Sequence, residues 1–193
     1  MSMDTVENII ERLKAFSTPE ICDGVGLFHA MYHDVKPLFE CDTVVGKAVT
    51  VEVPTGEAKI IADVIKQLMP GDVLVIAAKG NLESACWGDL RSRMALKHGA
   101  VGVIIDGAAR DIKGLRRAGL PIFARALCCG SAQLTGAGAA NIPVSCAGAV
   151  VCPGDIIMAD ENGVIAVKPQ EAEIAMEKAT KKKLAEVEKL KNA

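Results

Sequence analysis

The chain has 193 residues, half of them hydrophobic but only 3% aromatic, and a net charge of −2 at pH 7. The low charge and the scarcity of aromatic residues argue against a nucleic-acid-binding protein. The opening residues alternate charge with apolar side chains, unlike a signal peptide, and no apolar run reaches the roughly 18 residues of a membrane span. We therefore expect a cytoplasmic protein with no membrane or nucleic-acid partner, in which residues 1–193 form a single domain.

In the first half of the chain, helix and strand patterns alternate. Apolar residues recur at helical spacing near the N-terminus, and Ser17-Thr18-Pro19-Glu20 carries the signals of a helix start. A Pro-Gly-Asp turn at 70–72 precedes a continuous apolar run. The expected elements are helices at 4–16 and from Thr18 to Gly24 or Gly26, a half-buried strand at 45–53, a helix at 57–68 and a buried strand at 73–76.

The alternation continues to about residue 124 and then changes to short strands. The expected elements are helices at 89–98 and 111–118, strands at 101–105 and 121–124, short strands within 143–151, 156–158 and 163–167, and a charged helix from Pro169. Strands that alternate with helices predict a mixed α/β fold with parallel strands. The N-terminal helix and the charged C-terminal helix bracket this domain.

Charged residues that could take part in catalysis or ligand binding follow two consecutive strands of this pattern. Asp89 lies in Gly88-Asp89-Leu90, and Arg110-Asp111 follows the strand at 101–105. Because ligands bind beyond the carboxyl ends of parallel strands, we expect both segments to face one crevice. The Arg110 guanidinium could hold a carboxylate or an enolate oxygen, and Asp111 could hold a hard divalent cation.

Two further roles complete this hypothesis, and each residue also has a simpler interpretation. Asp89 could orient a water molecule, and the backbone N–H groups of Leu90 and Arg91, at a helix start, could receive a substrate carboxylate. The simpler alternative is that Asp89 only caps its helix and that Arg110 forms a surface ion pair. The combination favours cleavage of a carbon–carbon bond next to a keto acid.

Other patterns are weaker. His29 and His33 have the i, i+4 spacing of a zinc pair on a helix, but no third ligand is evident. The segment 136–141 half-matches a dinucleotide-binding motif without its last glycine, and is interpreted as a turn. Seven cysteines without a CxxC pair are expected to be buried small hydrophobic residues in a reducing cytosol.

The motifs TPEICDGVG, PGDVLVI, WGDL, VIIDGAARD, GLPIFARA and PGDIIMADENGVIAV occur in the order seen in the RraA-like family, which the chain resembles over residues 17–168. That family contains class II, metal-dependent 4-hydroxy-4-methyl-2-oxoglutarate aldolases, which also decarboxylate oxaloacetate. It also contains a non-catalytic regulator of ribonuclease E. The resemblance implies a compact αββα sandwich of the swivelling β/β/α type, assembled as homotrimers or homohexamers with sites at subunit junctions.

The resemblance also implies roles for individual residues. Asp111 would bind Mg²⁺ or Mn²⁺, Arg110 would contact the pyruvyl oxygen, and Asp89 would orient a water molecule that exchanges protons. The backbone at Gly88, Leu90 and Arg91 would receive the pyruvyl carboxylate. The regulator branch usually lacks these acids, so their presence favours an enzyme.

The resulting prediction is a lyase that cleaves 4-hydroxy-2-keto acids to pyruvate or decarboxylates oxaloacetate through a pyruvate enolate. The alternative is a non-catalytic protein that regulates a partner enzyme such as a ribonuclease. An acidic substrate would need a further cation for its distal carboxylate, and the candidates are Lys79, Arg91, Arg93 and Arg125.

Overall fold

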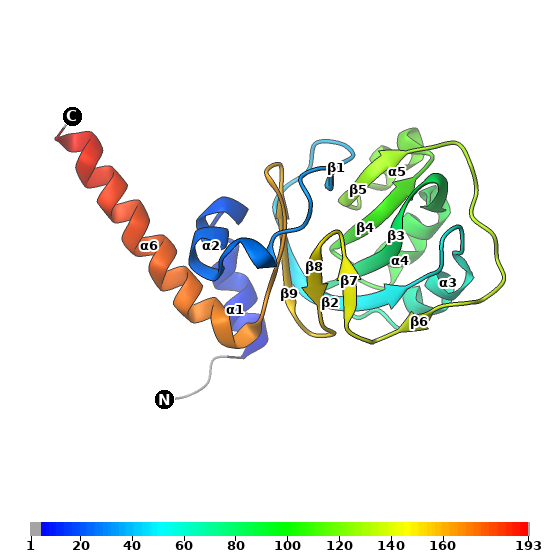
Figure 1. Cartoon of the computed structure of the whole chain (residues 1–193), viewed down its shortest axis with the longest axis horizontal. Coiled ribbons are helices and arrows are strands. Elements are labelled where there is room, and N and C mark those ends of the chain that lie inside the picture. The colour runs from blue at the N-terminus through cyan, green and yellow to red at the C-terminus, as the bar shows by residue number, and fades with distance from the viewer. Residues whose placement is uncertain (1–4, 193) are drawn as a thin grey trace.

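The computed structural model describes residues 5–192, which form a mixed α/β fold built on an eight-stranded sheet (Figure 1). The strand order is β1-β5-β4-β3-β2-β9-β10, with β6 paired to β2. The strands are β1 (Lys36–Pro37), β2 (Val44–Glu52), β3 (Asp72–Trp87), β4 (Gly102–Ala109), β5 (Ile122–Leu127), β6 (Ala139–Ala140), β9 (Ile156–Asp160) and β10 (Gly163–Val167). A separate hairpin consists of β7 (Val144–Cys146) and β8 (Ala149–Val151).

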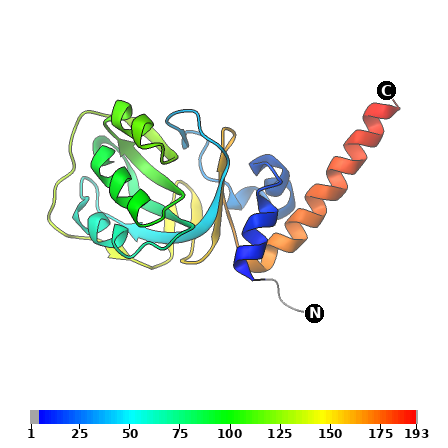
Figure 2. The same cartoon turned by 180° about the vertical axis from the view of Figure 1, so that it is seen from behind.

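Three helices cover one face of the parallel strands β2, β3, β4 and β5 (Figure 2). They are α3 (Lys59–Ile65), α4 (Asp89–Lys97) and α5 (Ile112–Ala118), all close to their predicted positions. Apolar residues of alternate strand positions, such as Leu74, Ile76 and Ile105, are fully buried against these helices. The hydrophobic core on this face therefore holds α4 and α5 against the sheet and so positions the first residues of both helices.

The opposite face of the parallel strands packs against the β7–β8 hairpin and against β9–β10, which belong to the same curved sheet. Val73, Val75 and Phe123 are fully buried on this side. The strand predicted at 45–53 is present, but the expectation that it is half-buried is wrong. Both of its faces are covered, because Val51 packs toward the helices and Ala48 packs toward the hairpin.

A third layer of helices lies beyond β9–β10, so that helices flank the strands on both sides. It consists of α1 (Val6–Leu13), α2 (Thr18–Val25) and α6 (Pro169–Lys191), and a short 3-10 helix, η1, spans Leu27–His29. Ile21 and Leu13 are fully buried in this layer with Ala175. The expected αββα arrangement is confirmed.

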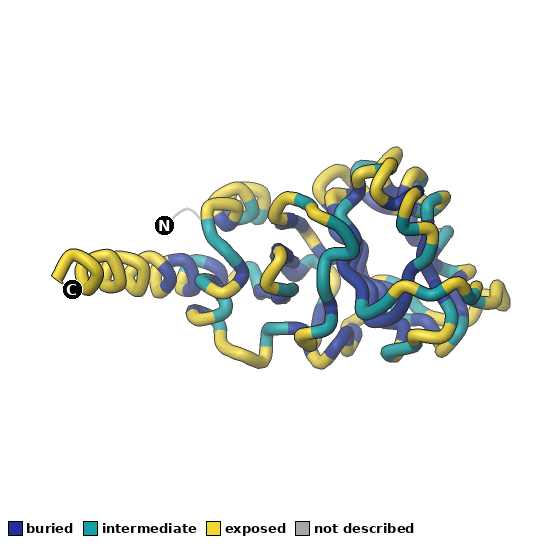
Figure 3. The backbone as a smooth tube through the Cα atoms, turned by 90° about the horizontal axis from the view of Figure 1, so that it is seen from above, coloured by how far each residue is buried: buried dark blue, intermediate teal, exposed yellow. Residues whose placement is uncertain are grey.

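The distal half of α6 projects away from the body of the molecule, and Figure 3 shows it exposed over several turns. Leu184 and Leu190 are 65% and 78% exposed, whereas Ala179 is buried. Within residues 5–192, no helix is both long enough and apolar enough to cross a membrane. All seven cysteines are free, but only Cys86 and Cys146 are buried, so the expectation of buried cysteines is wrong for the other five.

Strand β3 differs most from the sequence prediction. We expected a short buried strand at 73–76, but β3 continues to Trp87. Lys79 and Gly80, within this stretch, have φ values of +57° and +68°. The pairing with β4 shifts register between Ile76 and Asn81, and it shifts twice more before Trp87, which lies opposite Ala109. A bulged strand of this kind reads as a loop in sequence because the bulge interrupts its apolar pattern.

Asp160 connects the sheet to the outer helical layer. Its carboxylate accepts hydrogen bonds from the Thr18 backbone N–H at 2.8 Å, the Thr18 hydroxyl at 2.6 Å and the Asn162 N–H at 2.8 Å. Both Asp160 and Thr18 are buried, so water cannot replace a lost acceptor. We predict that Asp160→Ala lowers the free energy of unfolding by about 3 kcal/mol, because it leaves buried donors unpaired.

Urea unfolding followed by circular dichroism would measure this loss. Glu161→Ala, at the exposed neighbouring position, is the control and should change stability by no more than about 0.5 kcal/mol. Equal stability of the two variants would show that Asp160 does not anchor the outer layer.

Candidate functional site

The two segments singled out by the sequence lie side by side where β3 and β4 end. The Arg110 backbone N–H donates to the carbonyl of Trp87 at 3.0 Å, and this hydrogen bond joins the two segments where they leave the strands. Trp87 is buried beneath them, and its indole N–H donates to the Ser92 hydroxyl at 2.8 Å. The prediction that both exits face one crevice agrees with this geometry.

Asp111 lies in an unusual backbone conformation at the start of α5. Its φ and ψ are +64° and +40°, in the left-handed region. Its side chain is 51% exposed, and its Oδ2 atom lies 3.6 Å from Nε of Arg110. A Cβ atom on Gly88 would come within 2.7 Å of Oδ2, so the carboxylate occupies space that only glycine leaves open. Strained conformations of this kind often occur at functional sites.

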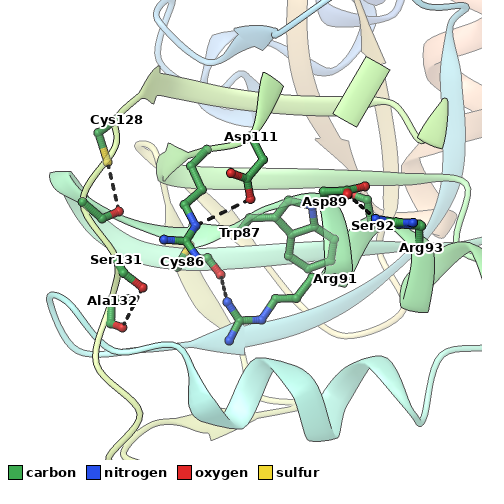
Figure 4. A network of polar contacts seen from close by, with 12 residues as sticks. Cys86, Trp87, Asp89, Arg91, Ser92, Arg93, Asp111, Cys128, Ser131 and Ala132 are labelled. Carbon is green, nitrogen blue, oxygen red and sulfur yellow. Dashed lines mark hydrogen bonds and ion pairs between the residues drawn. The ribbon is translucent and has the colours of Figure 1, made fainter. Parts of the chain in front are cut away.

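Asp89 is the first residue of α4, but it is not the helix cap. The cap position belongs to Gly88, so the interpretation of Asp89 as a capping residue is wrong. Its carboxylate pairs instead with Arg93, one turn along the same helix (Figure 4). A Cβ atom on Gly114 would lie 2.6 Å from Cβ of Asp89, so α4 and α5 touch at this point.

Arg91 contributes its backbone to the crevice rather than its charge. Its guanidinium donates to the carbonyls of Cys86 at 2.6 Å and Ala58 at 2.8 Å, as Figure 4 shows for Cys86. Burial lowers the pKa of this guanidinium. The first helical hydrogen bond of α4 comes from the Ser92 N–H, which donates to Gly88 at 3.1 Å. Within residues 5–192 the N–H groups of Leu90 and Arg91 accordingly have no hydrogen-bond acceptor, so they are available to an anion, which the helix dipole also favours.

Two hollows open on either side of this group of residues, and both are lined by Leu90, Arg110 and Asp111. The larger, of about 830 Å³, lies along α5 and is called the α5 hollow. The smaller, of about 300 Å³, lies toward α3 and is called the α3 hollow. The residues that line the α5 hollow but not the α3 hollow are Asp89, Ile112, Lys113, Gly114, Arg117, Leu127, Cys128 and Cys129.

The site suits a weakly held, hard metal ion better than a fully caged one. Within residues 5–192, no three His, Cys, Asp or Glu side chains gather as a metal-binding cluster. Mg²⁺ typically keeps several waters and binds through one or two carboxylates plus its substrate. The exposed carboxylate of Asp111, in its gap beside Gly88, fits that mode of binding.

The other sequence candidates lie elsewhere or take no part in the crevice. His29 ends η1, and its Nδ1 lies 2.9 Å from the carbonyl of Ala166. His33 lies in a turn beyond η1, so the two histidines do not share a helical face. Burial raises the pKa of the Cys86 thiol to about 12, which makes it a poor nucleophile. Part of the 136–141 turn forms β6.

Sequence reasoning missed Lys113 and Arg117, two cations of the α5 hollow. Their signal was available, because a spacing of four residues directly after Asp111 places both on one face of a helix. Lys79 and Arg125, which we considered for the distal substrate group, form ion pairs outside both hollows.

Glu57 fixes the segment that forms one wall of the α3 hollow. Its carboxylate accepts from the N–H groups of Ala58 at 2.9 Å and Lys59 at 2.6 Å, at the start of α3. It also accepts from the N–H of Thr135 at 2.7 Å and from the Thr135 hydroxyl. These bonds, that of the hydroxyl first, lower the pKa of Glu57 from 4.5 to about 2. Leu134, next to Thr135, lines the α3 hollow.

Solved structures with the same fold define the class of protein. The chain resembles the structure of Streptomyces coelicolor RraAS2, described as an unusual member of the RNase ES inhibitor RraA protein family, with a TM-score of 0.83 and 26% identity, covering 95% of this chain and 98% of that one. It also resembles the RNA-processing inhibitor RraA from Thermus thermophilis, with a TM-score of 0.73 and 25% identity, covering 79% and 93%.

The sequence itself places the chain more closely. Residues 18–166 match the family described as RraA-like, Aldolase/RraA, and the chain belongs to this family. A relative from Halalkalibacterium halodurans, named "Putative 4-hydroxy-4-methyl-2-oxoglutarate aldolase", is 36% identical over 91% of this chain and 83% of its own length. A Xanthomonas campestris relative with the same name is 32% identical over 83% and 96%.

The lowered pKa of Glu57 predicts a specific dependence of stability on pH. Because the folded pKa of about 2 lies below the ordinary 4.5, the ionised carboxylate stabilises the folded state above about pH 4.5. That stabilisation is lost as the pH falls from about 4.5 toward 2. Glu57→Gln should therefore be less stable than the natural protein at pH 7, and the difference should narrow at pH 3.

Urea unfolding at both pH values would measure the difference. Glu83→Gln, at an exposed position, is the matched control and should show no such narrowing. A difference between Glu57→Gln and the natural protein that is the same at pH 7 and pH 3 would contradict the assignment.

Proposed function

We propose that this chain is a divalent-metal-dependent lyase that releases pyruvate from 4-hydroxy-2-keto acids, decarboxylates oxaloacetate, or does both. The observation that carries the proposal is the gathering of Asp89, Arg110, Asp111 and the free N–H groups of α4 around one opening. Relatives named as aldolases, at 36% and 32% identity, point in the same direction.

The pyruvyl end of the substrate would bind between α4 and Arg110. Its carboxylate would accept hydrogen bonds from the N–H groups of Leu90 and Arg91, beside Gly88, where the helix dipole favours an anion. The 2-keto oxygen would then lie near the Arg110 guanidinium, which is half-exposed and tied only weakly to Asp111. A planar guanidinium can donate to an oxygen that gains negative charge.

Asp111 would hold Mg²⁺ or Mn²⁺, which when bound supplies Lewis-acid polarisation of the 2-keto oxygen. The gap beside Gly88 leaves the Asp111 carboxylate room to turn toward that ion. Asp89, with a side chain that is only 20% exposed, would keep a water molecule at the opening. Its carboxylate, held in place by Arg93, would orient that water molecule for proton exchange with substrate and product.

One bond-breaking pattern serves both reactions. In the retro-aldol reaction the C3–C4 bond breaks, the 4-hydroxyl gives its proton to the water at Asp89, and the electron pair of the broken bond passes to the pyruvyl fragment as an enolate. In oxaloacetate decarboxylation the same bond breaks and carbon dioxide leaves instead. In both, Arg110 stabilises the enolate oxygen, and the water at Asp89 delivers a proton to C3.

A second candidate function is regulation of a partner enzyme without catalysis. It is favoured by the two solved structures above, whose descriptions name RNA-processing and ribonuclease inhibitors. Those proteins are 25% and 26% identical to this chain. Binding of a ribonuclease together with absence of pyruvate release would favour this candidate.

We further propose that the chain assembles as a homotrimer or homohexamer. Leu27 and Phe28 of η1 are 78% and 93% exposed, and Val150 of the adjoining β8 is 65% exposed. Monomers rarely leave large apolar groups clustered in water. Light scattering after gel filtration should give three or six times the chain mass, and Phe28→Ser should lower the assembly state. A monomeric natural protein would contradict this proposal.

The proposed reaction predicts different effects of substitutions at the two adjacent charges. Arg110→Ala and Asp111→Ala should each lower kcat by about 10²–10³ or more, because each removes a preorganised charged contact. Asp111→Ala should also weaken the dependence of the rate on metal concentration, whereas Arg110→Ala should leave it intact. A coupled assay for pyruvate, with Mg²⁺ and with chelator, would measure both effects.

Arg116→Ala is the control, because Arg116 is exposed on α5 and lines neither hollow. It should retain the natural rate. If the natural protein releases no pyruvate from oxaloacetate or from 4-hydroxy-2-keto acids above a metal-free control, the lyase proposal fails.

A further inference from the structure

The cations near the site differ in whether their charge is already paired. Arg93 pairs with Asp89, and Lys79 pairs with Glu52 at 2.6 Å. Arg125 contacts two acidic side chains at 2.8 and 3.2 Å. None of these three side chains has a free charge to offer to a ligand.

Lys113 and Arg117 are different. Both line the α5 hollow, and within residues 5–192 neither forms an ion pair or a side-chain hydrogen bond. They lie four residues apart on α5, which places them on one face of that helix. Like charges at this spacing repel each other, so an anion bound between them would reduce an electrostatic repulsion that destabilises the unliganded helix.

The position of this pair relative to the catalytic residues is set by α5 itself. Asp111 is the residue before the helix, Lys113 lies in its first turn, and Arg117 lies one turn further on. Gly114, between them, contacts Asp89 closely enough that no side chain fits there. The row from Asp111 to Arg117 therefore runs along one wall of the α5 hollow, leading away from the reaction centre.

The α3 hollow lacks such a pair. Apart from the residues shared with the α5 hollow, its lining is mostly apolar, with Ala62, Met94 and Leu134. The Arg91 guanidinium on that side already donates to two carbonyls. A carboxylate placed there would lose its hydration without gaining a cation, which is unfavourable.

We infer that Lys113 and Arg117 are specificity-determining residues that bind the distal carboxylate of a dicarboxylic 2-keto acid. The pyruvyl end of that acid would lie at Arg110, and its chain would extend through the α5 hollow toward Arg117. This inference rests on the proposed function for the placement of the pyruvyl end. The charge of the distal group is inferred from the α5 hollow alone.

The test compares two five-carbon keto acids that differ at C5, where 2-oxoglutarate has a carboxylate and 2-oxopentanoate has a methyl group. Isothermal titration calorimetry with the full chain and Mg²⁺ would measure both affinities. The natural protein should bind 2-oxoglutarate at least tenfold more tightly, because a hydrogen bond to a charged group contributes about 1.5–3 kcal/mol.

Lys113→Ala and Arg117→Ala should each weaken the binding of 2-oxoglutarate about tenfold, because each removes a charged hydrogen bond, and should leave 2-oxopentanoate within about twofold. Arg117→Lys should recover part of the loss, because it keeps the charge but not the planar fork of donors. Arg116→Ala, with the same change of charge on the same helix, should bind both acids as the natural protein does.

The outcomes separate this inference from the proposed function. Equal affinity of the natural protein for the two acids, or equal losses in the Arg116 and Arg117 variants, would overturn the inference, even if pyruvate were released from neutral keto acids. If the Lys113 and Arg117 variants lost only 2-oxoglutarate binding and the natural protein released no pyruvate from any acid, the carboxylate-binding role of the two cations would be supported and the lyase proposal would fail.

Discussion

The site depends on the close approach of two chain segments that leave neighbouring parallel strands. The hydrogen bond from the Arg110 N–H to the Trp87 carbonyl holds the segments together, and Gly88 and Gly114 remove the side chains that would separate them. A Cβ atom at either glycine would approach a carboxyl-bearing side chain to within 2.7 Å or less. Without this contact, Asp89 and Asp111 would lie at the starts of two unrelated helices.

The same contact divides the polar groups into those that build the site and those that remain available to a ligand. The Arg91 guanidinium donates hydrogen bonds to two backbone carbonyls and thereby joins α4 to the segment before α3. Asp89 is held by Arg93, whereas the Asp111 carboxylate has, among residues 5–192, a single ion-pair partner in Arg110 at 3.6 Å. The groups with unused hydrogen-bonding capacity are therefore Asp111, Arg110 and the first N–H groups of α4, which are the groups that the proposed reaction requires.

The outer helical layer has a different role. It is joined to the sheet through Asp160 and Thr18 and packs on the far side of β9–β10, away from both hollows. Helix α6 extends beyond that layer, with Lys182 paired to Asp23 before the exposed distal turns begin. The separation of this layer from the reaction centre means that substitutions there should alter stability or assembly rather than chemistry.

Much of the architecture could be predicted from the sequence, because local signals were strong and agreed with one another. The Ser17–Glu20 capping box and the Pro-Gly-Asp turn before β3 each fix a boundary through interactions among neighbouring residues. The continuous apolar run at 73–76 predicted a buried parallel strand, since only a strand covered on both faces carries such a run.

The sequence also determined that Asp89 and Arg110-Asp111 follow consecutive strands, which brings them to one edge of the sheet. Only the tertiary structure decided which cations stay free, because Arg125 pairs with Asp34 and Lys79 pairs with Glu52, and both partners are distant in sequence. The bulge in β3 was hidden for the same reason. Its backbone is stabilised by pairing with β4, and no local residue pattern encodes a partner strand.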